Sequence, residues 1–184
     1  MTEFNLRLKA SVEANKFRYG YPWIYSNEII SDRRTKSLLP GSFCTLVDYN
    51  KNPICLVTVN PNSKIFARVM DYNIETIINA CWLKDRISKA LAKRKEIFRD
   101  PFYRLVNAEA DELPGLIVDR FDNVIVMQPN AFWAENMSEM IANSIKEVCS
   151  IDVVIKNASG RSRRLEGLDD KNSVFFGDLP EAAI

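Results

Sequence analysis

Short apolar runs separated by turn-forming residues fill the first 70 positions of the chain. Residues 5–9 alternate apolar and polar side chains, which is the period of a half-buried strand. Further apolar runs occupy residues 43–48, 54–59 and 65–70, and the turn-forming stretch 49–53 joins the first two of them. Evenly spaced short strands with such turns predict a small β-barrel or sandwich.

The hydrophobic period changes between Ile74 and Phe98. Apolar side chains recur there near helical spacing, for example at Leu83, Ile87 and Leu91. The last part of this stretch, residues 84–99, holds seven Lys and Arg side chains. The helix ends at Asp100-Pro101, because the residue before a proline is pushed out of the helical region. We expect this basic helix to connect two halves of the chain.

The second half of the chain reads as strands with one helix between them. Strands are predicted at residues 104–106, 116–120 and 124–128, a helix over 132–149, and further strands at 152–156 and 174–176. The predicted fold class is therefore α+β, with an N-terminal β-rich barrel followed by a β-β-β-α-β-β sheet and helix domain.

Composition excludes several kinds of site. The chain has no histidine, which removes the usual general base and rules out a Ser-His-Asp triad or a Cys/His zinc site. We therefore expect no metal. The cysteines form no C-x-x-C pair and stand among apolar neighbours, so we expect buried free thiols and a cytoplasmic location. They are Cys44, Cys55, Cys81 and Cys149. No run of about 18 apolar residues indicates a membrane span.

The net charge of +1 conceals an asymmetry along the chain. Residues 1–100 carry 17 Lys and Arg against 10 Asp and Glu, whereas residues 101–184 carry 8 against 14. A basic half joined to an acidic half indicates that only the first half meets a polyanion. Chance partitioning of solvated surface is the alternative.

Basic and aromatic side chains are interleaved between residues 16 and 29. Lys16 and Arg18 stand beside Tyr21 and Trp23, and a second basic group follows at residues 33–36. Aromatic rings stack on unpaired bases while cations meet phosphates, so this pattern is typical of RNA binding. A buried tryptophan beside a solvated charge run is the other interpretation.

Three acids, Glu109, Asp111 and Glu112, precede the Pro114-Gly115 turn. Clustered carboxylates suit a hard cation, but no calcium-loop pattern is present. The turn is either a domain-docking element or a plain structural turn. The basic loop of residues 160–164 has two interpretations, a contact with RNA phosphate or an exposed solvated loop.

Four segments together resemble one family. They are GYPWIYSNEI at 20–29, PNSKIFARVM at 61–70, YRLVNAEADELPGLIVDRF at 103–121 and RLEGL at 164–168. In this order they resemble the bacterial ribosomal RNA large subunit methyltransferase I family, in which the first opens a PUA domain (named for pseudouridine synthase and archaeosine transglycosylase). The chain departs from the family at Tyr21, where histidine is usual, and at Glu112, where glycine is usual.

The resemblance implies a role in an S-adenosylmethionine-dependent 23S rRNA cytosine-C5 methyltransferase. Ribosomal RNA is then the partner, and seven side chains are the candidate RNA contacts. These are Lys16, Arg18, Tyr21, Trp23, Arg33, Arg34 and Arg68.

Family members continue into a Rossmann-like domain that binds S-adenosylmethionine and carries the attacking cysteine. The six glycines of this chain form no G-x-G turn for such a cofactor. We therefore expect no Rossmann domain, no cofactor and no catalytic residue in this chain, which we expect to be inactive without the methyltransferase domain. The expected parts are a PUA-like domain (1–72), a basic connecting helix (73–100), a central α+β domain (101–179) and the start of a linker (180–184).

The expected function is to position rRNA for that catalytic domain. A stand-alone RNA-binding module and a non-catalytic interaction scaffold are the alternatives. The sequence is compatible with more than one oligomeric state, and a dimer is among them.

Overall fold

The computed structural model describes residues 4–178. The chain divides into two compact units, unit 1 over Met1–Ile77 and unit 2 over Ile78–Ile184. The helix expected to connect the halves belongs to unit 2, where it packs on the sheet of that unit. The expected linker at 180–184 lies outside the described residues. No helix among residues 4–178 is long and apolar enough to span a membrane.

Unit 1 is built on a five-stranded sheet in the order β1-β3-β4-β5-β2. Strand β1 is parallel to β3, and the other pairs are antiparallel. The strands enclose a core that includes Leu6, Phe17, Ile24 and Leu46, all fully buried. The bounds of the strands are β1 Asn5–Arg7, β2 Trp23–Tyr25, β3 Phe43–Val47, β4 Pro53–Val59 and β5 Ile65–Asp71.

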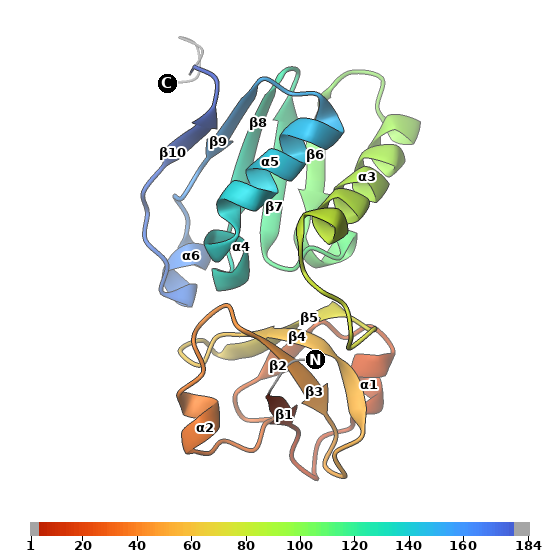
Figure 1. Cartoon of the computed structure of the whole chain (residues 1–184), viewed down its shortest axis with the longest axis vertical. Helices are drawn as coiled ribbons and strands as arrows, with labels where there is room; N and C mark the ends of the chain where they lie inside the picture. Colours follow the sequence, from red (N-terminus) through yellow and green to blue (C-terminus); the bar gives the residue numbers. More distant parts are fainter. Residues whose placement is uncertain (1–3, 179–184) are drawn as a thin grey trace. The chain divides into compact units, whose positions relative to one another are not determined.

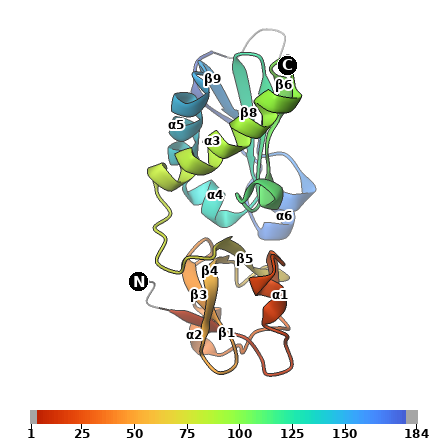
Figure 2. The ribbon, with the colours of Figure 1, turned by 90° about the vertical axis from the view of Figure 1, so that its right-hand side faces the viewer.

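Two one-turn helices connect the strands of unit 1. Helix α1, Asn15–Arg18, follows β1, and helix α2, Arg33–Lys36, follows β2. Figures 1 and 2 show that the two helices lie on different sides of the unit. Each is too short to be stable by itself, so the surrounding chain holds it in place.

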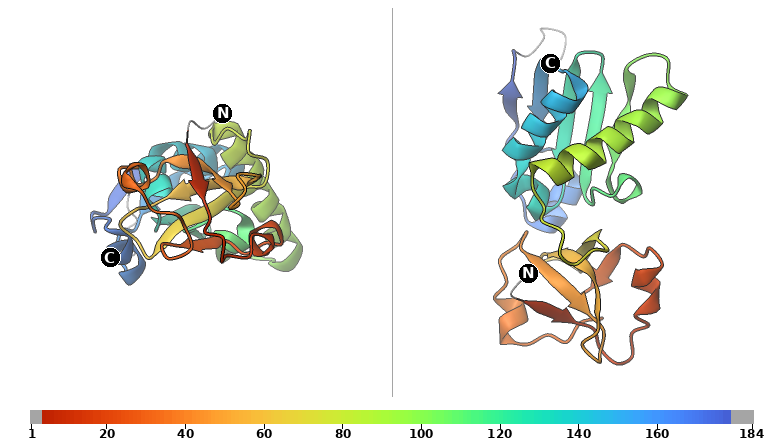
Figure 3. Two further views of the ribbon diagram at one scale, coloured as in Figure 1. Left: turned by 90° about the horizontal axis from the view of Figure 1, so that it is seen from below. Right: turned by 45° about the vertical axis from the view of Figure 1, so that its right-hand side comes forward.

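Unit 2 contains a second five-stranded sheet, in the order β10-β9-β8-β7-β6. Its strands are β6 Phe102–Asn107, β7 Leu116–Phe121, β8 Val124–Pro129, β9 Val153–Lys156 and β10 Ser173–Phe176. Its helices are α3 Ala80–Ile97, the 3-10 turn η1 Ala108–Asp111, α4 Phe132–Asn136, α5 Ser138–Cys149 and α6 Arg161–Glu166. Helices α3 and α5 lie on the same face of the sheet (Figure 3, right).

The pairing direction in unit 2 differs along the sheet. Strands β8 and β9 are parallel, whereas the other neighbouring pairs are antiparallel. Helices α4 and α5 make the connection from β8 to β9, so this part is a β-α-β crossover of the kind found in α/β proteins. The sequence pattern predicted the order of the elements but carried no information on this direction.

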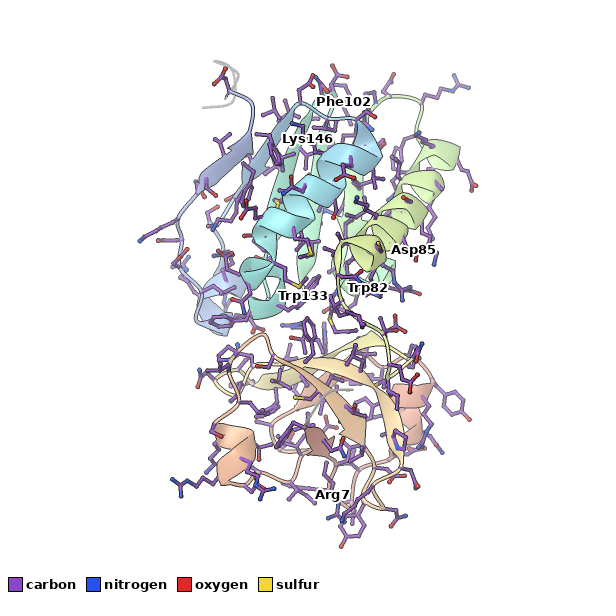
Figure 4. The ribbon with its side chains drawn as sticks, viewed as in Figure 1. Arg7, Trp82, Asp85, Phe102, Trp133 and Lys146 are labelled. Carbon is purple, nitrogen blue, oxygen red and sulfur yellow. The ribbon has the colours of Figure 1, made fainter. Side chains whose placement is uncertain are left out.

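Helix α3 begins at Ala80, six residues later than the periodicity suggested. The Asn79 side chain accepts a hydrogen bond from the Trp82 amide over 3.0 Å and so caps the first turn. Trp82 meets the fully buried Trp133 edge to face, with 6.3 Å between ring centroids (Figure 4). The Trp133 indole donates to the Pro114 carbonyl over 2.7 Å, which ties α4 to the loop before β7.

Candidate nucleic-acid interface

Helix α1 presents a lysine between aromatic rings. The Lys16 ammonium lies 4.8 Å from the centroid of Phe17 and 4.9 Å from that of Tyr21, and it is ion-paired with Glu28. Phe17 is buried and Tyr21 is 39% exposed, with their rings edge to face at 6.1 Å. Packing against Phe17 therefore fixes the orientation of an accessible Tyr21 ring beside a cation.

The same aromatic group affects a second tyrosine. A side-chain hydrogen bond with Tyr21 raises the pKa of Tyr25 above its ordinary value, and burial acts in the same direction. The backbone amide of Tyr25 donates to a Glu28 carboxylate oxygen over 2.8 Å. Glu28 thus joins β2 to α1 through both Tyr25 and Lys16.

Arg18 links α1 to the loop between β3 and β4. Its guanidinium donates a hydrogen bond to the Asn15 side chain over 3.1 Å and lies 3.7 Å from an Asp48 oxygen. Hydrogen bonds from Asn52, side chain first, hold the pKa of Asp48 below its ordinary value. Asp48 and Asn52 therefore form a rigid base for the tip of this loop.

The tip of that loop carries an exposed tyrosine that the sequence analysis did not select. Tyr49 is 48% exposed, and the Arg7 guanidinium lies 4.7 Å from its ring centroid. Arg7 also donates to the Tyr49 carbonyl over 2.8 Å (Figure 4 labels Arg7). Tyr19, which is 86% exposed and follows Arg18 in the chain, was also not among the predicted RNA contacts. Only the aromatic-cation spacing in the 49–51 turn could have indicated Tyr49.

We call the residues Arg7, Lys16, Arg18, Tyr19, Tyr21 and Tyr49 the α1 surface. It joins exposed rings from α1 and the β3–β4 loop to the exposed cation of Arg18 and the half-buried cations of Arg7 and Lys16. Chemically it offers faces for stacking on bases and donors for phosphate oxygens. It includes three of the seven sequence-predicted RNA contacts.

Trp23 and Arg68 form a second group. They are direct cross-strand neighbours on β2 and β5, and both are half-buried. Each makes an interaction within the protein. Trp23 is therefore neither a fully buried core residue nor a freely exposed ring.

Arg33 and Arg34 form a third group on α2, where both are exposed. Asp32 and Thr35 cap this helix reciprocally, with the Thr35 amide 2.8 Å from an Asp32 oxygen and the Asp32 amide 2.7 Å from the Thr35 hydroxyl. The bond from the Thr35 side chain is the main reason that the pKa of Asp32 lies below its ordinary value. Because α1 and α2 lie on different sides of unit 1 (Figure 1), the seven predicted residues do not form one patch.

The acidic turn of unit 2 is tied to α3. Asp111 is buried and forms a two-point ion pair with Arg94, whose Nη1 lies 2.9 Å from one carboxylate oxygen. The Asn107 amide donates to the other oxygen over 2.8 Å. Glu112 has φ +58° and pairs with Arg86, and Glu109 is half-buried. Both carboxylate oxygens of Asp111 are therefore bonded to groups within unit 2.

Glu112 stands where the resembled family usually has glycine, and its positive φ explains why glycine suits this position. A positive φ is strained for most side chains and free for glycine. Glu112 adopts it at the end of η1, with its carboxylate paired to Arg86. Among residues 4–178, no group of three or more His, Cys, Asp or Glu side chains is placed to hold a metal ion.

The basic loop at 160–164 folds as α6, and its arginines differ in burial. Arg163 is fully buried, donating to Glu135 over 2.8 Å and to the Asp169 carbonyl over 2.9 Å. Lys156, also buried, donates to the other Glu135 oxygen over 2.7 Å. Arg163 therefore cannot meet a phosphate, whereas Arg161 and Arg164 are exposed.

Burial makes three of the four thiols weak acids. Desolvation raises the pKa of Cys44 and of Cys55 to about 12 and that of Cys149 to about 11. A thiol attacks as its thiolate, so these three are poor nucleophiles near neutral pH. Cys81 is exposed at the start of α3, which departs from the expectation that all four are buried.

Comparison with known proteins matches most of the chain. Residues 6–72 match a family model described as a PUA-like domain. A ribosomal RNA large subunit methyltransferase of Deinococcus radiodurans is 29% identical over 95% of this chain. The ribosomal RNA large subunit methyltransferase I of Shewanella frigidimarina is 30% identical, also over 95% of this chain. The chain spans less than half of these relatives, 45% and 44% of their lengths.

Solved structures show the same fold. A candidate SAM-dependent methyltransferase from Streptococcus mutans superposes on 97% of this chain and 44% of its own, with a TM-score of 0.77 and 14% identity. A candidate methyltransferase solved with SAH covers 85% of this chain and 40% of its own, with a TM-score of 0.70 and 14% identity.

These superpositions overturn the predicted fold class. The prediction placed the chain outside the methyltransferase fold, as α+β with no Rossmann domain, yet SAM-dependent methyltransferase structures match nearly all of it. The mixed sheet with the parallel β8–β9 crossover is the feature that the prediction missed. Local periodicity reports strand and helix, but the direction of pairing depends on the whole chain.

Proposed function

We propose that this chain, a homologue of the ribosomal RNA large subunit methyltransferase I family over most of its length, binds ribosomal RNA through unit 1. In this role it positions the RNA for cytosine-C5 methylation. The α1 surface is the observation that carries the proposal, because it combines exposed tyrosines with cations held at fixed positions. The PUA-like match over residues 6–72 falls within the same unit.

Each part of the α1 surface has a distinct task in this proposal. Arg18 and Lys16 neutralise phosphates, exchanging contacts with Asp48 and Glu28 for contacts with RNA. Tyr19, Tyr21 and Tyr49 stack on unpaired bases, which fits a target in a single-stranded or looped segment. Trp23, Arg33, Arg34 and Arg68 remain predicted contacts of a longer RNA.

We further propose that residues beyond those of this chain supply the chemistry of methyl transfer. The cysteine-based family mechanism needs a reactive thiolate, and burial raises the pKa of three thiols here well above neutrality. S-adenosylmethionine would supply the methyl group. Gly115 and Gly177 approach Ala131 and Val153 of the protein itself, so these two glycines serve packing within unit 2. More than half of each relative lies outside the match.

Salt-dependent RNA binding tests the RNA part of the proposal. The affinity of the chain for a 23S rRNA fragment should fall steeply with salt, because phosphate contacts release counterions. The Lys16→Ala/Arg18→Ala variant should bind more weakly and reduce the slope of log affinity against log salt by roughly 1 to 2.

The matched control is Arg33→Ala/Arg34→Ala, which removes the same number of charges from the α2 side. This variant should lose less RNA affinity than Lys16→Ala/Arg18→Ala, because the α1 surface is the proposed main site. Weak affinity that is indifferent to salt would rule out the RNA-binding role. A larger loss for the α2 variant would move the site to α2.

Calorimetry with S-adenosylmethionine tests the cofactor part separately. We expect no heat of binding from the 184-residue chain and clear binding by the full-length Deinococcus radiodurans relative. Micromolar binding by the chain itself would place the cofactor site here.

A further inference from the structure

One face of the unit 2 sheet has no covering layer among the described helices of that unit. Helices α3 and α5 lie on the same side of the sheet, as the right-hand view in Figure 3 shows. Residues directed to that side, such as Ile125, Met127 and Val154, are fully buried. The intervening residues on the same strands are half-buried.

The intervening residues form an apolar surface, which we call the open face. Cross-strand register places Val126 beside Ile155 and Ile155 beside Val174, with Val124 beside Val153 in the next row. Val174 is 41% exposed. The open face is defined by Ile117, Val124, Val126, Val153, Ile155 and Val174.

The sequence of the central strands is that of strands buried on both faces. A sheet with one wet face normally alternates apolar and polar residues, whereas strands covered on both faces are continuous apolar runs. Strand β8 begins Val124-Ile125-Val126-Met127, and β9 begins Val153-Val154-Ile155 before it ends at Lys156, whose side chain pairs with Glu135. Both strands therefore have the composition for a second covering layer.

The rim of the open face extends the apolar area toward the edge strand. Phe102 and Phe121 are cross-strand partners, 61% and 50% exposed (Figure 4 labels Phe102). Five strands spaced about 4.8 Å apart and rising about 3.3 Å per residue make a face of about 20 Å by 15 Å. Apolar patches of about 300 Å² or more commonly mark interaction sites.

We propose that the open face is the docking surface for the part of the methyltransferase polypeptide that the relatives have outside the match. This inference rests on the proposed function. More than half of each relative's length lies in that part, so each relative has enough further polypeptide to form a covering layer. A protein surface of matching apolar character buries the valine and isoleucine side chains as a second layer buries any sheet face.

The charge of the open face disfavours RNA as its occupant. Asp119 is the cross-strand neighbour of Val126 and so lies on the same face, and its ion pair with Arg104 of the edge strand β6, joined at 2.9 Å, is neutral as a unit. Residues 101–184 carry 14 acidic against 8 basic side chains. Counterion release, the main source of affinity for RNA, has no basic cluster to act through on this face.

Hydroxyl-radical footprinting tests the proposal, because it reports side-chain exposure directly. The 184-residue chain and the full-length Deinococcus radiodurans relative are oxidised under identical conditions. With each rate divided by the intrinsic reactivity of its residue type, we expect the residues aligned with Phe121, Val126 and Ile155 to react several-fold more slowly in the full-length relative. The residue aligned with Leu165, which is 67% exposed on α6, serves as the control and should react equally in both.

Each other result overturns the docking proposal. Equal rates at the open face would show that no part of the relative covers it. Protection of the isolated chain on adding a 23S rRNA fragment would make the face an RNA surface. Protection that appears only as the chain concentration rises would make it a contact between two copies. The salt-dependence experiment on unit 1 is unaffected by these results, so the two proposals fail separately.

A pair of neighbouring substitutions tests whether the face is open in the chain itself. Ile155→Thr keeps a β-branched side chain at a half-buried position, and Val154→Thr places the same hydroxyl in the helix-covered core. We expect the first to leave the midpoint of thermal unfolding nearly unchanged and the second to lower it clearly. Equal losses would mean that the open face is already covered within the chain.

Discussion

Units 1 and 2 use their basic side chains in opposite ways. In unit 1, Arg18 and Lys16 lie at the surface beside exposed tyrosines. Each forms an ion pair with a carboxylate, and both ion pairs are partly exposed to solvent. In unit 2, Arg163 is fully buried and Arg94 is largely so, each held by a carboxylate of the same unit. The difference separates cations available to a ligand from cations that stabilise the fold.

The same difference is seen in two of the recognisable sequence segments, whose charged side chains pair inside unit 2. The acids of YRLVNAEADELPGLIVDRF include Asp111, which joins η1 to α3 through Arg94. The RLEGL segment follows Arg163, which joins α6 to α4 through Glu135. Both segments build unit 2, whereas the α1 surface lies in unit 1.

The largest expected effect is on Arg163. Replacing it with methionine leaves Glu135 with one fewer partner and removes the bonds to the Asp169 carbonyl, so unit 2 should lose about 3–5 kcal/mol of stability. Urea unfolding followed by the fluorescence of buried Trp133 measures this. The exposed neighbour Arg164→Met should change stability by at most about 0.5 kcal/mol. Equal effects would contradict the internal role of Arg163.

Asp111 should show the next largest effect. Asp111→Asn keeps the shape of the side chain but leaves Arg94 without its charged partner, at a cost of about 3 kcal/mol. Glu112→Gln removes an ion pair whose carboxylate is 62% exposed and should cost at most about 1 kcal/mol. The same urea titration compares the two. A larger loss for Glu112→Gln would reverse their assigned roles.

Tyr19 tests the surface side of the comparison. If its ring stacks on a base, Tyr19→Ser should weaken RNA binding by about 1–3 kcal/mol without changing protein stability. Leu39→Ser, at a side chain 75% exposed near α2, provides the control. Fluorescence anisotropy with a labelled 23S rRNA fragment gives both affinities. Unchanged binding by Tyr19→Ser would remove that ring from the α1 surface.

The smallest effect concerns pH and the cap of α2. The pKa of Asp32 is lowered in the folded state, so its carboxylate contributes to the free energy of unfolding. This contribution is present above the unfolded-state pKa of about 3.9 and is lost as pH falls through the folded-state pKa. Asp32→Asn retains a capping side chain that does not titrate. The advantage of the wild type over Asp32→Asn in thermal midpoint should therefore shrink below about pH 4. If the difference in thermal midpoint between the two proteins does not change with pH, the Asp32 carboxylate is not the cap of α2.

The sequence predicted local structure well where the pattern is local. The strands expected at 43–48, 54–59 and 65–70 are found at Phe43–Val47, Pro53–Val59 and Ile65–Asp71. Apolar alternation and turn residues are enough to place such elements. The parallel β8–β9 pairing was not predictable in this way, and the fold class was wrong for that reason.

The candidate site was predictable only in part. The Lys16 to Tyr21 group is local in sequence, so α1 and the turn that follows it bring the group together. Arg7 and Tyr49 are 42 residues apart and meet only through the sheet, so no short pattern indicates their contact. The burial of Arg163 likewise depends on Glu135 and Pro129 from other elements.

Ultraviolet cross-linking of the chain to a 23S rRNA fragment, with the linked peptides identified by mass spectrometry, tests the central claim most directly. The account predicts links in peptides that contain residues 15–21 and 48–52 of unit 1, with unit 2 left largely unlinked. Links concentrated on the strands of unit 2 would contradict it.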